Sequence, residues 1–282
     1  MYDWFMDTGI RIVAIIVVAL ILYLVLKLLI PKLMRRHISK RMADESETAI
    51  NQRIDTLSSI MDTIVGIVIL ILALLTILPE FGVNIATLLA GVGVIGLALA
   101  FAAQGLVKDF IGGFFVLFED QYRIGDVVGI AGIVGVIEEI TLRRSIMRDI
   151  DAKVHSIPNG HVDISTNYTR NYSRVNLDIS VGYGEVLGKV IETIDRVCQE
   201  MAEDPKWKDD FVSTPAVLRV NNLGDSGVEI KILGDTKPAS QWAIMGELRL
   251  RIKNTFDSEG IEIPWPHTKV YFGNSPNTSN QN

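Results

Sequence analysis

The chain has 282 residues, of which 49% are hydrophobic and 21% are charged. This composition is too apolar for an ordinary soluble protein and too charged for a chain lying wholly in a bilayer, so it predicts a membrane part and a water-facing part. The formal net charge of −6 and the lack of a basic cluster interleaved with aromatic residues argue against nucleic-acid binding, and the single cysteine, Cys198, excludes an intrachain disulfide.

Two apolar stretches near the start predict membrane helices at about residues 10–30 and 57–78. Asp62, the only charged residue of the second stretch, is expected at the level of the lipid headgroups. The connection after the second helix, residues 79–83, has no lysine or arginine. By the positive-inside rule, the N-terminus is predicted outside and the first connection in the cytoplasm, because that connection carries Lys32, Arg35, Arg36, Lys40, Arg41 and Arg53.

A third membrane helix is predicted at residues 84–104, within a run from Phe81 to Val107 that has no charged side chain. At ~100° per residue, Leu97 and Phe101 share one narrow face of this helix. Small residues share that face or flank it, which is typical of helices that contact other helices closely. These expected packing residues are Ala90, Gly93, Gly96, Ala98 and Ala100.

Copies of this helix could stand side by side in a ring, with Leu97 and Phe101 directed at the axis. The pore lining would then be uncharged. A narrow apolar constriction of this kind excludes ions by dewetting. The pattern leaves an alternative open, because helices rich in small residues also pack inside ordinary helix bundles.

The apolar sequence continues beyond this helix, through residues 105–118. One straight helix from Phe81 to Phe118 would be about 57 Å long, too long for a single crossing of a ~30 Å hydrocarbon core. We therefore expect a kink at Gly105, with Gly112 and Gly113 as the alternative hinge. These residues complete a transmembrane domain predicted at residues 1–118.

A β domain is predicted at residues 119–172. Runs rich in Ile and Val and cut by glycine indicate short strands that form a small antiparallel β-barrel or a curled sheet. The expected strands are at residues 122–128, 133–140, 145–150 and 153–157. His155 and His161 have no cysteine or carboxylate at ligand spacing, so no metal site is expected.

An α/β domain is predicted at residues 173–266, with strand, helix, strand, strand and helix in that order. Ile244, Leu248, Ile252 and Phe256 recur every fourth residue in the second helix, and Ser240 is placed to cap it. A further strand at residues 261–263 would complete a ferredoxin-like fold. Residues 267–282 are expected to form a short C-terminal strand, at 268–272, and a tail.

The chain resembles the small-conductance mechanosensitive channel family. The resemblance lies in the small-residue third helix with its Gln104-Gly105 step, followed in order by Arg123-Ile124-Gly125-Asp126 and Pro158-Asn159-Gly160. It implies a gate at Leu97 and Phe101, a kink at Gly105, and seven subunits in a bacterial inner membrane. The family usually has Leu at both gate positions, so Phe101 is a departure that affects the expected pore diameter.

The function predicted is therefore a homo-oligomeric ion channel opened by membrane tension, which releases ions and small osmolytes on hypo-osmotic shock. Its expected partners are further copies of itself, membrane lipids and the permeating solutes; no catalytic site and no cofactor is expected. A weaker hypothesis pairs Asp55 with Arg123 to couple the outer helices to the β domain, although two exposed charges would contribute under ~1 kcal/mol. The alternative function is a membrane-anchored enzyme or signalling protein that works through its ferredoxin-like domain.

Overall fold

The computed structural model describes residues 2–41, 47–266, 268 and 270. The chain divides into two compact units, Met1–Ala103 and Gln104–Asn282. The helices are α1 (Tyr2–Arg41), α2 (Glu47–Ile77) and α3 (Ala86–Phe118), with the short 3₁₀ helix η1 (Leu78–Phe81) between the last two. All three long helices are apolar enough to cross a membrane, as the sequence predicts.

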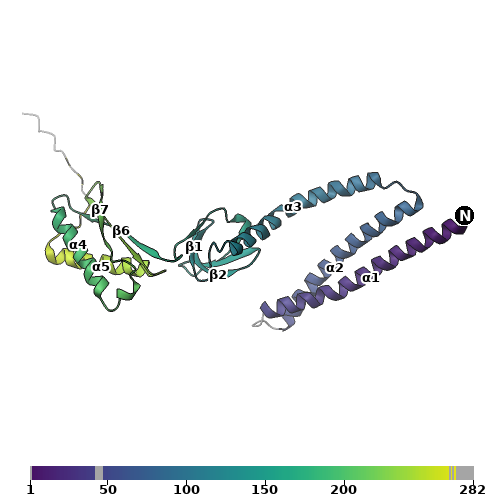
Figure 1. Ribbon diagram of the computed structural model, residues 1–282, viewed down its shortest axis with the longest axis horizontal. Coiled ribbons are helices and arrows are strands. Elements are labelled where there is room, and N and C mark those ends of the chain that lie inside the picture. The colour runs from purple at the N-terminus through teal and green to yellow at the C-terminus, as the bar shows by residue number, and fades with distance from the viewer. Residues whose placement is uncertain (1, 42–46, 267, 269, 271–282) are drawn as a thin grey trace, which may run out of the picture. The chain divides into compact units, whose positions relative to one another are not determined.

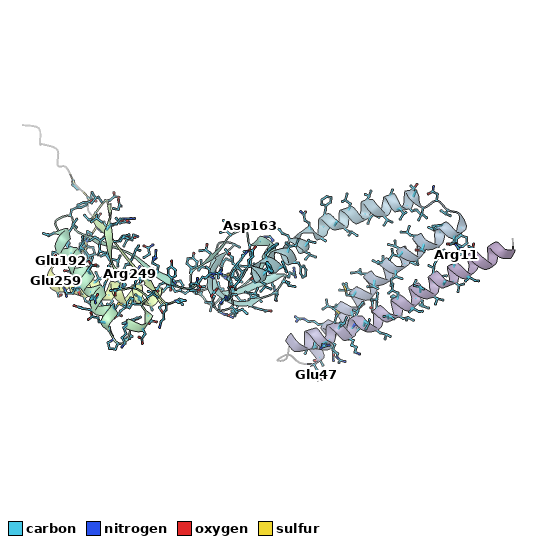
Figure 2. The ribbon with its side chains drawn as sticks, viewed as in Figure 1. Arg11, Glu47, Asp163, Glu192, Arg249 and Glu259 are labelled. Carbon is cyan, nitrogen blue, oxygen red and sulfur yellow. The ribbon has the colours of Figure 1, made fainter. Side chains whose placement is uncertain are left out.

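In the first unit, α1 and α2 lie side by side and run in opposite directions (Figure 1). Pro79 follows the end of α2 and lies in η1, and Gly82 ends η1 in a left-handed conformation with φ of 76°. At the same end of the pair, Arg11 of α1 lies 4.0 Å from Glu80 (Figure 2). The side chain of Asn84 then accepts a hydrogen bond from Ala86 N at 2.9 Å, which fixes the start of α3.

A five-stranded antiparallel sheet follows α3. Its spatial order is β4-β3-β2-β1-β5, so it is an open sheet in which the described residues of β4 and β5 do not pair with each other. A bulge between Ile137 and Glu139 bends β2. The strands are β1 (Val127–Ile130), β2 (Ile133–Ile140), β3 (Arg144–Arg148), β4 (Val154–Pro158) and β5 (Ser165–Asn167), with the short helix η2 (Asn159–His161) after β4.

The last domain has a three-stranded sheet of order β6-β8-β7 against which two helices pack. The predicted four-residue period of α5 is confirmed, because Ile244, Leu248, Ile252 and Phe256 are all buried in this core. Burial also raises the pKa of the Cys198 thiol to about 12. The elements are β6 (Ser173–Val181), α4 (Leu187–Glu203), η3 (Lys208–Asp210), β7 (Ala216–Leu223), β8 (Val228–Thr236) and α5 (Gln241–Glu259).

Some local predictions differ from the structure. Residues 261–263 form no strand; a single backbone bond joins Gly182 N to Glu262 O at 3.0 Å. Ser240 does precede α5, but its hydroxyl donates to Asp210 at 3.0 Å and does not cap the helix. β5 was absent from the predicted strands. The predicted strand at 268–272 falls outside the described residues, except for Thr268 and Val270, which are not in a strand.

Candidate functional site: the α3 helix and its β-domain contact

The first half of α3 is not buried against the described residues of its own chain. Every residue from 86 to 102 is exposed, although almost all of them are apolar. Leu97 is 59% exposed and Phe101 is 67% exposed. Since water-exposed apolar surface of this extent is unfavourable, this helix needs lipid or another protein surface around it.

The small residues of α3 are also open. An added Cβ would meet nothing within 4 Å at Gly93, Gly96 or Gly105, and Ala90, Ala98 and Ala100 are exposed. Packing within the described chain therefore does not explain why these positions are small. Exposed small residues are typical of helices that contact other helices closely, and this role of the small residues stays a prediction.

The second half of α3 is bound to the β domain. α3 continues as one helix through Gly105, Gly112 and Gly113 to Phe118, so the helical hydrogen bonding is not broken at either expected hinge. A Cβ added at Gly113 would lie 1.9 Å from the carbonyl oxygen of Leu142, and one at Gly112 would lie 2.7 Å from that of Asn159. Only glycine permits these approaches of backbone to backbone.

Asp109 lies on the same side of α3 and is only 6% exposed. Its carboxylate accepts a hydrogen bond from Gly160 N at 3.1 Å, and its other oxygen lies 3.8 Å from Arg143 Nε. A Cβ at Gly160 would come within 2.6 Å of Asp109. This carboxylate therefore joins α3 to the chain segment just after β4.

Asn159 holds the opposing backbone in place and is almost fully buried. Its amide donates to the carbonyl oxygens of Thr141 at 2.8 Å and Leu142 at 3.1 Å. Its Oδ1 accepts from the Ser145 hydroxyl at 2.9 Å, and that hydroxyl lies 3.0 Å from the Tyr122 hydroxyl. Burial raises the pKa of Tyr122. The Pro-Asn-Gly motif thus shapes the surface against which α3 packs. This role of the motif was not predicted from the sequence.

The Arg123-Ile124-Gly125-Asp126 motif forms a turn where a strand was predicted. Gly125 has φ of 95°, and Arg123 N donates to the Asp126 carboxylate at 2.9 Å. Gly125 N donates to Ile137 O at 2.8 Å, and Ile137 N donates to Asp126 O at 2.9 Å. The strand therefore begins later than expected, at Val127.

Two arginines hold the end of α3. The Arg123 guanidinium donates twice to Asp120, at 2.8 and 2.6 Å, and this hydrogen bonding lowers the pKa of Asp120. Arg170 donates to the carbonyl oxygens of Asp120 and Gln121 at 2.7 and 3.2 Å. Arg123 thus has a partner within its own unit, and its coupling with Asp55 of α2 stays a prediction.

Within the described part of the chain, no group of three His, Cys, Asp or Glu side chains could hold a metal ion. His155, one of the two histidines considered from the sequence, instead lies 2.9 Å from Asp149 across the turn between β3 and β4.

Three helices apolar enough to span a membrane, an α3 helix exposed along its first half and a β domain bound to its second half indicate a multi-pass membrane protein with a water-facing part. The mechanosensitive ion channel family matches the chain in three consecutive parts. These are transmembrane helices 2/3 at residues 63–104, the beta-domain at 105–174 and the MscS C-terminal domain at 175–263.

Named relatives agree with this class. The small-conductance mechanosensitive channel of Caldanaerobacter subterraneus is 38% identical over 231 residues, 82% of this chain and 81% of that protein. The moderate conductance channel YbiO of Escherichia coli is 29% identical over 75% of this chain and 29% of its own length. The chain belongs to the MscS family of mechanosensitive ion channels, and it is a multi-pass membrane protein.

Solved structures show the same fold. The closed-state crystal structure of Helicobacter pylori MscS matches with a TM-score of 0.65 at 22% identity, over 93% of this chain and 99% of that one. Arabidopsis thaliana MSL1 matches with a TM-score of 0.59 at 16% identity, over 93% and 98%. Family and fold together point to an ion channel and not to the membrane-anchored enzyme that the sequence left as the alternative.

Proposed function

We propose that this protein is a homo-oligomeric channel opened by membrane tension, in which copies of α3 surround the pore. The observation that carries the proposal is the exposure of every residue from 86 to 102 on an apolar helix rich in glycine and alanine. One such helix cannot enclose a pore, so several copies are required. The family resemblance favours seven.

The proposed gate consists of two stacked rings, one of Leu97 and one of Phe101. Leu97 and Phe101 are four residues apart, a rise of about 6 Å along a helix, so the two rings lie about one turn apart on the same face. Neither side chain carries a charge or a hydrogen-bonding group. A narrow constriction of this kind is closed to ions because water leaves it.

The small residues beside the gate would allow the helices to slide during opening. Gly96 and Ala100 lie on one flank of the gate face and Ala98 on the other, whereas Gly93 and Ala90 lie on the face itself. Tension favours whichever state has the larger area in the membrane plane, and it shifts the equilibrium only through that difference. An open pore would pass ions and small osmolytes during hypo-osmotic shock.

The proposed setting is a bacterial inner membrane, with the N-terminus outside and the β and α/β domains in the cytoplasm. Support comes from the basic residues near the end of α1 and the start of α2, such as Arg35 and Arg53, and from the absence of lysine and arginine at residues 79–83. The bend that would let α3 leave the membrane is proposed at Gly105, with Gly113 as the second position. Gly105 is the less crowded of the two, because a Cβ added there meets nothing within 4 Å, whereas one added at Gly113 meets the Leu142 carbonyl oxygen.

Patch-clamp recording from liposomes that contain the purified protein tests this function. The wild type should give tension-activated currents, and its size in detergent should be that of a large oligomer. Phe101→Ser should open at lower tension or leak, because a hydroxyl ring allows water into the gate. Leu99→Ser is the matched control, since position 99 lies on the opposite side of the helix.

Two results would contradict the proposal. A monomer or dimer in detergent could not form the ring. Opening thresholds for Phe101→Ser that match both the wild type and Leu99→Ser would remove Phe101 from the gate.

A further inference from the structure

Lys27 of α1 and Asp62 of α2 lie at the same level of the antiparallel helix pair (Figure 1). The level is fixed by a neighbouring contact, because a Cβ added at Gly66 would lie 3.5 Å from Cε2 of Tyr23. Lys27 follows Tyr23 by four residues, and Asp62 precedes Gly66 by four residues. In helices that run in opposite directions, a step of about one turn along each brings these two side chains opposite each other.

A second contact fixes the same level from the other side. The Ser58 hydroxyl lies 3.6 Å from Sδ of Met34. Lys27 precedes Met34 in α1, and Asp62 follows Ser58 in α2. The two charged residues therefore lie between two contacts of the helix pair, and both line one polar cavity of about 380 Å³.

The two opposite charges are not paired with each other at the Asp62 Oδ1 atom. Nζ of Lys27 lies 5.7 Å from the ring centre of Tyr23. Asp62 Oδ1 is buried and has no hydrogen-bond partner among the described residues. A buried acceptor without a donor is costly, and ionisable residues in membrane-spanning helices usually pair with one another. The nearest side chain suited to satisfy this oxygen is the lysine opposite it.

α1 is weakened at this same level by a proline. Pro31 lies inside the helix and has no N–H, so it cannot donate the helical hydrogen bond to the carbonyl oxygen of Lys27, four residues earlier. Helices kink most readily at proline. Pro31 also lines the polar cavity, so a bend of α1 at this point would move Lys27 relative to Asp62.

We propose that Lys27 and Asp62 form a charge switch within the α1–α2 pair. In the arrangement that the structure shows, the ammonium group lies by the Tyr23 ring. In a second arrangement, reached by a bend of α1 at Pro31, the ammonium group leaves the ring and donates to Asp62 Oδ1. The flexible four-carbon stem of lysine permits this movement, and a pair that water screens little is strong.

The switch gives the outer helices two discrete arrangements that differ by one ion pair. Membrane tension can shift the balance between them only if they differ in the open and closed channel. This consequence rests on the channel function proposed above, whereas formation of the pair itself does not.

A double-mutant cycle in the full-length oligomer tests the switch. Lys27→Met and Asp62→Asn each remove one charge. In patch-clamp recordings from liposomes, each should change the ratio of open to closed channels at a fixed tension about tenfold, as expected for one charge-assisted hydrogen bond. The double variant should change this ratio clearly less than the product of the two single changes. Lys27→Asp combined with Asp62→Lys should restore most of the wild-type ratio.

The same cycle is measured on the melting temperature of the oligomer in detergent, which requires no current. The shifts should be less than additive for Lys27→Met with Asp62→Asn. Asp55→Asn is the matched control, because Asp55 lines the same cavity but lies about two turns from Asp62 along α2. Its shift should add to that of Lys27→Met.

Three results would overturn the proposal. Additive melting shifts for the Lys27 and Asp62 variants would show that no pair forms. Coupling of Lys27 to Asp55 in place of Asp62 would assign the wrong partner. Coupled melting shifts with an unchanged ratio of open to closed channels would show a fixed pair and not a switch. A wild type without tension-activated current would instead contradict the channel function, and the melting cycle would still decide whether the pair forms.

Discussion

Gly113 shows how closely α3 approaches the β domain. Gly113→Ala would place a methyl group 1.9 Å from the Leu142 carbonyl oxygen, so either the helix or the β2–β3 turn must move. We expect the free energy of unfolding to fall by at least about 1–3 kcal/mol, the usual range for overpacking. Thermal unfolding of the detergent-solubilised channel measures it.

Gly105→Ala is the matched control for Gly113→Ala, because it lies on the same helix in open space. Alanine favours a helix over glycine by up to about 1 kcal/mol, so this control should be neutral or stabilising. Equal melting temperatures for Gly113→Ala and the wild type would show that α3 does not approach Leu142 so closely.

Asp109 makes a second testable contact at the same place. Asp109→Ala would leave the buried Gly160 N–H without an acceptor, which costs about 1–3 kcal/mol. Asp109→Asn keeps an acceptor and should recover most of the loss. Hydrogen exchange at the Gly160 amide reports the contact directly, and it should speed up in Asp109→Ala only. Unchanged protection of that amide in the alanine variant would contradict the assigned bond.

In the turn between β3 and β4, the ionisation of one carboxyl group, that of Asp149, makes the stability of the fold depend on pH. The hydrogen bond from His155 lowers the pKa of Asp149, and the amides of Lys153 and Asp151 add to this effect. A carboxyl group whose pKa is lower in the folded state stabilises the fold above its unfolded pKa of about 4. That stability is lost as the pH falls through the lower, folded pKa.

Asp149→Asn should therefore lower the melting temperature at neutral pH and reduce its decline in acid. Thermal melts from pH 7 down to pH 3 measure both effects. Asp151→Asn is the control from the same turn, since Asp151 is exposed and pairs only with the exposed Lys153. If the melting temperature of Asp149→Asn falls with pH as it does in the wild type and in Asp151→Asn, the Asp149–His155 pair does not stabilise the turn.

At the scale of elements, the sequence predicts most of the fold because hydrophobic periodicity reports burial. α5 shows this clearly, since its four-residue period places Ile244 to Phe256 in the core. β5 escaped prediction because Ser165–Asn167 is short and polar and is held by pairing with β1. The strand expected at residues 261–263 had the right composition, but only one backbone bond joins it to the end of β6.

The site was only partly predictable for a related reason. Leu97 and Phe101 could be placed on one face of α3 because helical geometry is local. The contact of Asp109 with Gly160 joins residues far apart in the chain, and no periodicity reports such a pair. A charged residue inside an otherwise apolar helix was the available signal, and Asp109 could have been singled out by it.

At the scale of the whole molecule, the open flanks of α3 lead to the last prediction. Gly93→Leu and Gly96→Leu would each place a bulky side chain where the proposed ring brings helices together, so neighbouring copies could not slide past one another. We expect no opening, or opening only near the tension that ruptures the membrane, in patch-clamp recordings from liposomes. Size in detergent should show that the variants still assemble.

The control for these variants is Val92→Leu, which adds bulk on the far side of the helix from Leu97 and should open normally. Because Gly93 and Gly96 are exposed and a Cβ added at either meets nothing within 4 Å, we do not expect loss of opening in either variant to arise from a clash within one described subunit. It would therefore report contact between subunits. Normal currents from both glycine variants would mean that the small residues do not form the moving interface, and the ring would need another surface.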